Sequence, residues 1–244
     1  MKVLSLAGRN FKEAYREVGV IPLAVGQPVV FMLLFFFIDT GDPAAPDIFQ
    51  IDMLVPGIIL FSLGFLTLFS ALFLARDRQS ALLTRLLATP LTAADFILAY
   101  ITPYILIALL QITACFIIGL ILGMSFSTGI LLSFIIFIPL AIGCTALGIA
   151  LGSIFSENVA PGVGAVAITI MTLLGGVWMD LRMVGGWMER IAFWLPFAPA
   201  LDAARVLIGG GSLAQVGSEL IWLLGYMVVF IFLGIITFRW RTRR

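Results

Sequence analysis

The sequence predicts an all-α, polytopic membrane protein with six transmembrane helices. Of its 244 residues, 62% are hydrophobic and only 11% are charged, and the mean hydropathy is +1.18. Soluble domains are about half apolar and a quarter charged. Six stretches are long enough to cross a bilayer, which takes about 20 apolar residues each. A helix satisfies the backbone hydrogen bonds of such a stretch internally.

The elements begin with residues 1–19, where Lys, Arg and Glu interrupt the apolar core that a signal peptide needs. The remainder, residues 20–244, contains the six apolar stretches. These predicted spans lie near residues 20–38, 53–75, 96–122, 130–155, 159–179 and 220–238.

Two local signals concern the start and the packing of spans. Thr92 and Asp95 have the spacing of a capping box at the start of the third span. Glycines spaced four apart at 119–123 and 148–152 fit close helix approach. We expect these glycine pairs to make contacts within one subunit.

The distribution of basic residues predicts the orientation. Four lie in the N-terminal segment, three in the segment 76–95 and four after the last span, against three in the loop after the fifth span. Cytoplasmic loops are enriched in Lys and Arg. We therefore predict that both termini and the segment 76–95 are cytoplasmic.

The outer region at residues 180–219 holds one further apolar stretch, at 191–201. It is too short for a span and is interrupted by Pro196 and Pro199. We predict a short helix that enters the outer interface or re-enters it, with Trp187 and Trp194 at headgroup depth. An ordinary amphipathic outer loop is the alternative.

Missing residue types exclude several functional classes. The chain has no histidine, which removes Ser–His and Cys–His dyads and His-ligated zinc. It has no Gly-Lys-Ser/Thr sequence for a phosphate-binding loop. The spans carry essentially no charge at mid-membrane, where ion-coupled carriers usually keep one, although carbonyl-based ion sites stay open. Uphill transport would therefore need energy from a separate subunit.

The segment 76–95 is a basic amphipathic island between two spans, and residues 76–90 form its predicted helix. Arg78, Arg85 and Thr89 follow each other at helical spacing, with four leucines on the opposing positions. Pro90 ends the predicted helix. Such a helix along the cytoplasmic surface can transmit a push from a docked protein into both spans. The alternative is a plain interfacial helix whose arginines bind lipid headgroups.

Part of this island is similar to a segment of a known protein family. Its run DRQSALLTRLLATPLT, residues 77–92, resembles the cytoplasmic segment of the ABC type-2 exporter permeases. A second match comprises GGVWM at 175–179, LPFAP at 195–199 and DAAR at 202–205. It is similar to that family's fifth span, its outer re-entrant helices and the ending before its last span. Together with the layout and length, the resemblance covers nearly the whole chain.

The resemblance implies a half-transporter rather than an enzyme. Two copies would pair as a homodimer in the cell (inner) membrane, and each would carry a separate nucleotide-binding ATPase subunit that holds ATP and Mg. Residues 1–19 would form an amphipathic interfacial helix, residues 20–244 the transmembrane domain, and residues 76–90 the coupling helix. This chain itself would bind no cofactor, metal or nucleic acid, and membrane lipid would surround it.

The same resemblance assigns residues. The predicted ATPase-coupling residues are Asp77, Arg78, Arg85, Leu86, Thr89 and Pro90. The substrate route is expected along the dimer interface, lined by the first, second and fifth spans, and its predicted contacts are Gln27, Phe31 and Phe61. The residues assigned to the outer re-entrant region are Trp187, Trp194, Pro196 and Arg205. For Gln27, a hydrogen bond between helices is the simpler alternative.

The expected function is export of an amphipathic or lipid-like solute, such as a drug, an antibiotic or a lipid. Apolar spans without charge favour such a solute, because a buried charge would need a partner. A lipid-linked glycan or polysaccharide is the alternative substrate, and a non-transport membrane assembly protein is the alternative function.

Overall fold

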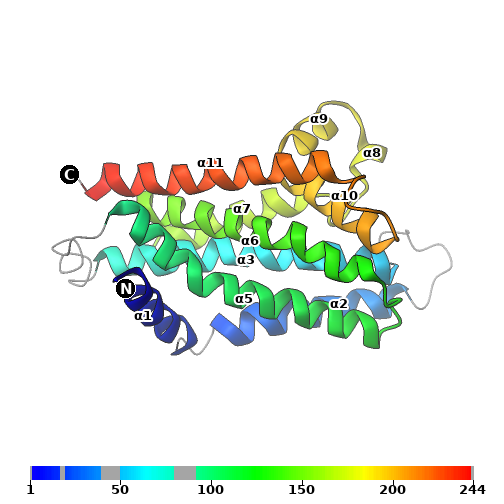
Figure 1. Ribbon diagram of the computed structural model, residues 1–244, viewed down its shortest axis with the longest axis horizontal. Coiled ribbons are helices and arrows are strands. Elements are labelled where there is room, and N and C mark those ends of the chain that lie inside the picture. The colour runs from blue at the N-terminus through cyan, green and yellow to red at the C-terminus, as the bar shows by residue number, and fades with distance from the viewer. Residues whose placement is uncertain (1, 17–19, 40–49, 80–91, 243–244) are drawn as a thin grey trace.

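The computed structural model describes residues 2–16, 20–39, 50–79 and 92–242, and nearly all of them are helical. The helices form an elongated bundle whose long members run side by side (Figure 1). In order they are α1 (Lys2–Arg16), α2 (Val20–Asp39), α3 (Ile51–Gln79), α5 (Ala93–Ile121), α6 (Thr128–Ile154), α7 (Ala160–Leu174), α8 (Leu181–Val184), α9 (Gly186–Trp194), α10 (Phe197–Ile208) and α11 (Gly217–Thr242).

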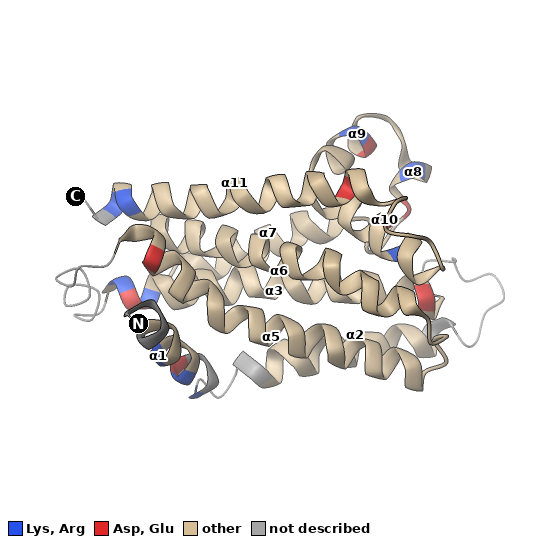
Figure 2. Ribbon diagram, viewed as in Figure 1, with Lys and Arg blue, Asp and Glu red and all other residues tan. Residues whose placement is uncertain are grey.

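The two ends of the bundle differ. Both chain termini, α1 and the end of α3 lie at one end, which we call the terminal end, whereas α8, α9 and α10 lie at the other, the distal end (Figure 1). Charged residues gather at the two ends and leave a long apolar midsection between them (Figure 2). This pattern is typical of a protein whose midsection lies in lipid.

The centre of the bundle is the contact between α3 and α6. Gly148 and Gly152 of α6 make the close approach, since a Cβ atom at either position would overlap the backbone of α3 at Thr67 or Ala71. The prediction that this glycine pair packs within one subunit is confirmed. In the other pair, Gly123 stands in a turn with a positive φ of 107° and makes no such contact.

The prediction of six spans is only partly confirmed. Among the described residues, four helices are long and apolar enough to cross a membrane, namely α3, α5, α6 and α11. The first predicted span is helical over its whole length, as α2, but its apolar stretch Pro22–Phe37 is shorter than the four spanning helices. The fifth is also a shorter apolar helix, Ala160–Leu174 in α7. The fifth span was predicted to reach residue 179. It ends earlier because Gly176 adopts a positive φ of 72°, a conformation that glycine tolerates.

The end of α3 and the start of α5 can be compared with the predicted bounds of the coupling helix, residues 76–90. We predicted that the second span ends at residue 75, but α3 continues through Gln79, so the first residues of the predicted coupling helix belong to α3. Residues 80–91 lie outside the described part of the chain. At the start of α5, Thr92 Oγ1 accepts a hydrogen bond from Asp95 N at 3.2 Å, and Asp95 Oδ2 accepts one from Thr92 N at 2.9 Å. The predicted capping box is confirmed.

The distal end contains a bent pair of helices. α9 and α10 meet at an angle of 80° and together satisfy the length and composition of a span. Pro196 stands at the bend as the N-cap of α10, where its missing N–H costs nothing. The face of α10 at residues 197–201 is buried in the bundle. This geometry is that of a broken or re-entrant apolar element.

Candidate functional site

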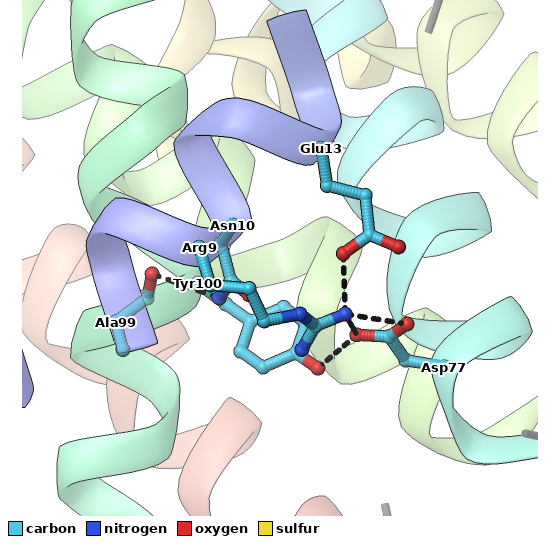
Figure 3. A network of polar contacts seen from close by, with 6 residues as sticks. All are labelled: Arg9, Asn10, Glu13, Asp77, Ala99 and Tyr100. Carbon is cyan, nitrogen blue, oxygen red and sulfur yellow. Dashed lines mark hydrogen bonds and ion pairs between the residues drawn. The ribbon is translucent and has the colours of Figure 1, made fainter. Parts of the chain in front are cut away.

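The terminal end contains a network of charged and polar side chains centred on Asp77 (Figure 3). Asp77 lies in the last turn of α3, and its side chain is only 8% exposed. Both of its carboxylate oxygens accept from Arg9 Nη2 at 3.3 Å, and one also accepts from the hydroxyl of Tyr100 on α5. Glu13 forms an ion pair with the same Arg9 nitrogen. We call these four residues the Asp77 network.

The amphipathic pattern of α1 explains why its polar residues reach this network. Leu6 and Ala7 are buried against the bundle, and Asn10 is fully buried beside them. Asn10 Nδ2 donates a hydrogen bond to the carbonyl oxygen of Ala99 at 3.1 Å (Figure 3). Arg9 and Glu13 are one helical turn apart, so both lie on the same face. α1 is thereby attached to α5 through Asn10 and to α3 through Arg9.

Neighbouring carboxylates favour the charged form of the Arg9 guanidinium in this network. Burial lowers the pKa of the Arg9 guanidinium, but the charges of Asp77 and Glu13 raise it by more, so that the net pKa lies above its ordinary value. The ion pair with Asp77 is shielded from water on the carboxylate side, where removal of one partner leaves a charge without compensation. The Asp77 network therefore stabilises the junction of α1, α3 and α5.

A second arginine joins α3 to α6. Arg78 Nη1 donates to the carbonyl oxygens of Gly152 at 2.8 Å and Phe155 at 3.3 Å. These carbonyls belong to the C-terminal end of α6, where the helix leaves acceptors unsatisfied and a positive charge is favourable. Nearby, Arg76 pairs with Glu157 at 3.0 Å. The last turn of α3 is thus attached to three other parts of the bundle.

The structure brings together only part of the predicted coupling set. Asp77 and Arg78 are neighbours in α3, and their described contacts lie within the chain. Arg85, Leu86, Thr89 and Pro90 lie outside the described residues, so the coupling role of the set stays a prediction.

Sequence reasoning missed Arg9 and Tyr100 as members of the network. The four-residue spacing of Arg9 and Glu13 indicates a charged face on α1, but their pairing with α3 and α5 depends on the tertiary fold.

The predicted contacts of the substrate route lie around a group of aromatic rings, which we call the aromatic cluster: Phe31, Phe35, Phe61 and Trp178. The ring centroids of Phe31 and Phe61 are 5.1 Å apart, and Trp178 lies 5.4 Å from Phe61 and 5.0 Å from Phe35. All four side chains are half-buried. The cluster joins α2, α3 and the turn after α7. Sequence reasoning did not assign two of its members, Phe35 and Trp178, to the route.

Gln27 lies one helical turn before Phe31 on α2. Its Oε1 atom is buried and has no hydrogen-bond partner among the described residues, so the structure does not supply the interhelical bond that was the alternative for this side chain. By contrast, Gln111 Nε2 donates to the carbonyl oxygens of Ala24 at 2.8 Å and Ser62 at 3.4 Å. Gln111 therefore joins α2, α3 and α5 at depth.

The residues assigned to the outer re-entrant region occupy different positions at the distal end. Trp187 and Trp194 are 74% and 65% exposed. The carbonyl oxygen of Trp194 accepts from Trp222 Nε1 at 3.2 Å and from the hydroxyl of Tyr226 at 2.8 Å, which attaches the α9–α10 bend to α11. Pro196 is buried at that bend. The predicted depth of these tryptophans in a membrane stays a prediction.

Arg205 joins three elements at the same end. Its Nη2 donates to the carbonyl oxygens of Met53 at 3.4 Å and Gly176 at 3.5 Å. α10 is therefore attached to the start of α3 and to the turn after α7.

Within residues 2–16, 20–39, 50–79 and 92–242, no group of His, Cys, Asp and Glu has the arrangement of a metal site. Cys115 and Cys144 are buried and free, as expected for small packing residues.

Comparison with known families identifies the chain. A family model described as "ABC-2 type transporter" matches residues 1–208. The chain belongs to the ABC-2 type transporter family. No curated protein matches the sequence. The family and the apolar helices together show a multi-pass membrane permease component of an ABC transporter. The family also implies a partner subunit with an ATP-binding cassette. The resemblance seen in the sequence is thus confirmed at the level of the family.

Proposed function

We propose that this chain is the permease half of an ABC exporter. Two copies pair as a homodimer, a separate ATPase docks on the cytoplasmic side of each, and an amphipathic or lipid-like solute moves outward between the copies. The observation that carries the proposal is the Asp77 network in an ABC-2 permease: it joins α1, the end of α3 and α5 at the terminal end, where the predicted coupling helix begins. That end is the cytoplasmic one in this proposal.

The contacts at the terminal end support the proposal that the ATPase drives movement of the permease from that end. The Asp77 network attaches α1 to α3 and α5, and Arg78 attaches α3 to the end of α6. A displacement of residues 80–91 by a docked ATPase would therefore move several helices together rather than one. Such concerted movement is what rigid-body alternating access needs.

The aromatic cluster supports the route of the solute. It is half-exposed, carries no charge and lies on α2, α3 and the turn after α7, within the first, second and fifth predicted spans. Aromatic faces accept apolar and amphipathic groups over a large contact area. In the proposed homodimer, the exposed side of this cluster faces its counterpart in the second copy, with Gln27 Oε1 as a buried acceptor one turn away.

The first test is coupling through Arg85. We expect that Arg85→Glu leaves the permease folded in the membrane but reduces the co-purified ATPase by about tenfold or more, since a reversed charge at a docking site adds repulsion to the loss of attraction. ATP-dependent uptake of a fluorescent amphipathic dye into inside-out vesicles should fall in parallel.

The matched control is Arg190→Glu, which reverses a charge at the distal end. It should retain both the ATPase and the dye uptake. Unchanged uptake and ATPase content in Arg85→Glu would reject the coupling role. Failure of the wild-type chain to co-purify with any ATPase would instead favour a membrane assembly protein.

A further inference from the structure

The distal end contains a cavity of about 370 Å³ between the bent helix pair and the start of α11. It lies in the size range of ligand pockets, about 300–1,000 Å³. We call it the distal cavity. The lining residues that matter here are Arg182, Phe193, Asp202, Val206, Glu219 and Trp222. The aromatic cluster contributes none of them, so the cavity is separate from the proposed solute route.

The position of α11 indicates the level in the membrane at which the distal cavity lies. Glu219 and Trp222 stand in the first two turns of this helix, which is one of the four that can cross a membrane. The first turns of a spanning helix lie at the level of the lipid headgroups, where Trp is enriched. Further along α11, Val228 and Val229 are exposed apolar side chains, as expected beside acyl chains. The cavity therefore opens at headgroup level next to a lipid-facing helix.

The charges of the distal cavity have both signs. Arg182 Nη2 pairs with Asp202 Oδ2 at 2.8 Å, and its guanidinium lies 5.6 Å from the ring centroid of Phe193. The Arg182 side chain is nevertheless 69% exposed, which leaves other guanidinium donors accessible. Glu219 accepts a hydrogen bond from the Ser218 hydroxyl at 2.8 Å. Among the described residues, no cation lies within ion-pair distance of Glu219.

This arrangement complements a zwitterion whose anionic part is a phosphate and whose cationic part is an ammonium. Arginine is well suited to phosphate because it offers several donors in one plane. A carboxylate accepts hydrogen bonds from a primary ammonium but not from a quaternary one. A quaternary ammonium instead needs an aromatic cage, whereas one of the two rings here, Phe193, is already covered by Arg182.

We propose that the distal cavity binds the headgroup of phosphatidylethanolamine. The phosphate contacts Arg182, the primary ammonium contacts Glu219, and the acyl chains follow the apolar surface of α11 past Trp222. Because Trp222 donates to the carbonyl oxygen of Trp194, the bound lipid rests against one of the two residues that attach the α9–α10 bend to α11. The lipid site does not depend on the proposed export function.

The test measures lipid binding to the purified full-length chain by native mass spectrometry. Phosphatidylethanolamine, phosphatidylcholine and phosphatidylglycerol with identical acyl chains are titrated separately. The wild-type chain should prefer phosphatidylethanolamine. Glu219→Gln should weaken that lipid by about fivefold, the usual scale for one partly exposed charge pair, and leave the other two nearly unchanged. Arg182→Gln should weaken all three, because each carries a phosphate.

The matched controls are Glu189→Gln and Arg190→Gln on α9, which change the same charges outside the cavity lining. Thermal unfolding of each variant in detergent checks that the fold is retained. Equal affinities for phosphatidylethanolamine and phosphatidylcholine would overturn the proposal, as would equal behaviour of Glu219→Gln and Glu189→Gln. Soluble phosphoethanolamine should compete poorly. If it displaced the lipid at equal concentration, the ligand would be a free zwitterion and the lipid assignment would be wrong.

Discussion

Asp77 shows, at the scale of a single residue, how one carboxylate can fix the relation of three helices. Burial of a carboxylate is costly unless charges and hydrogen bonds compensate it. Here Arg9 on α1 and Tyr100 on α5 provide both. We predicted Asp77 as an ATPase-coupling residue, and that role stays a prediction beside its contacts within the chain. Its influence on coupling would then act through the position of the segment that follows it.

Asp77→Asn tests this stabilising role. The amide can still accept from Tyr100, but it removes the charge that faces Arg9. We expect the free energy of unfolding to fall by about 2–3 kcal/mol, and α1 to become more accessible to protease. Thermal unfolding in detergent and limited proteolysis measure the two effects.

Glu13→Gln is the matched control, since it removes a carboxylate from the same Arg9 at a side chain that is 47% exposed. An exposed pair contributes less than about 1 kcal/mol. If both variants had equal stability, the Asp77 network would not hold α1 in place.

At the scale of elements, the contact between α3 and α6 depends on the absence of side chains at two positions of α6. A Cβ atom at Gly148 would overlap the backbone oxygen of Thr67 and the hydroxyl of Ser70. The same Ser70 hydroxyl donates to the carbonyl oxygen of Thr145 at 3.1 Å. The glycine thus permits hydrogen bonds between the helices as well as close packing.

Gly148→Val should force these helices apart. We expect a loss of about 3 kcal/mol or more, at the upper end of the usual cost of overpacking, because backbone rather than a flexible side chain is in the way. The readout is the unfolding temperature in detergent. Gly225→Val in α11 is the control, because a Cβ there meets open space. A similar loss in both variants would show that valine itself, not the contact with α3, causes the effect.

At the scale of the whole molecule, the aromatic cluster and the terminal end have different expected roles. Phe61→Ala and Trp178→Ala remove rings from the proposed route without touching the Asp77 network. We expect each to reduce the apparent affinity for a transported amphipathic dye by about fivefold, since one aromatic contact contributes about 1 kcal/mol, while the ATPase still co-purifies. Vesicle uptake over a range of dye concentrations measures this.

Phe232→Ala is the control for these variants, because Phe232 is an exposed aromatic residue on α11, away from the cluster. It should transport the dye as the unaltered chain does. Equal uptake by Phe61→Ala and Phe232→Ala would argue against a route along the aromatic cluster.

The sequence predicted features that depend on nearby residues or on composition. The capping box at Thr92 and Asp95 is such a local feature, and the all-helical, multi-pass class follows from composition. Helix ends were less accurate: α3 continues past residue 75 because charged residues can extend a helix beyond the apolar core. The pairing of Arg9 with Asp77 joins residues far apart in the chain, and no spacing rule in one sequence can predict it.

α3 is held by an arginine near each end: Arg78 binds the end of α6, and Arg205 binds the carbonyl oxygen of Met53. The stretch of α3 between these attachments, from Met53 to Arg78, is about 38 Å long at 1.5 Å per residue. A helix fixed to neighbours at both ends cannot slide along its own axis without breaking one attachment. We therefore expect α3 to tilt together with α6 and α10, so that force applied on one side of the bilayer changes the packing on the other.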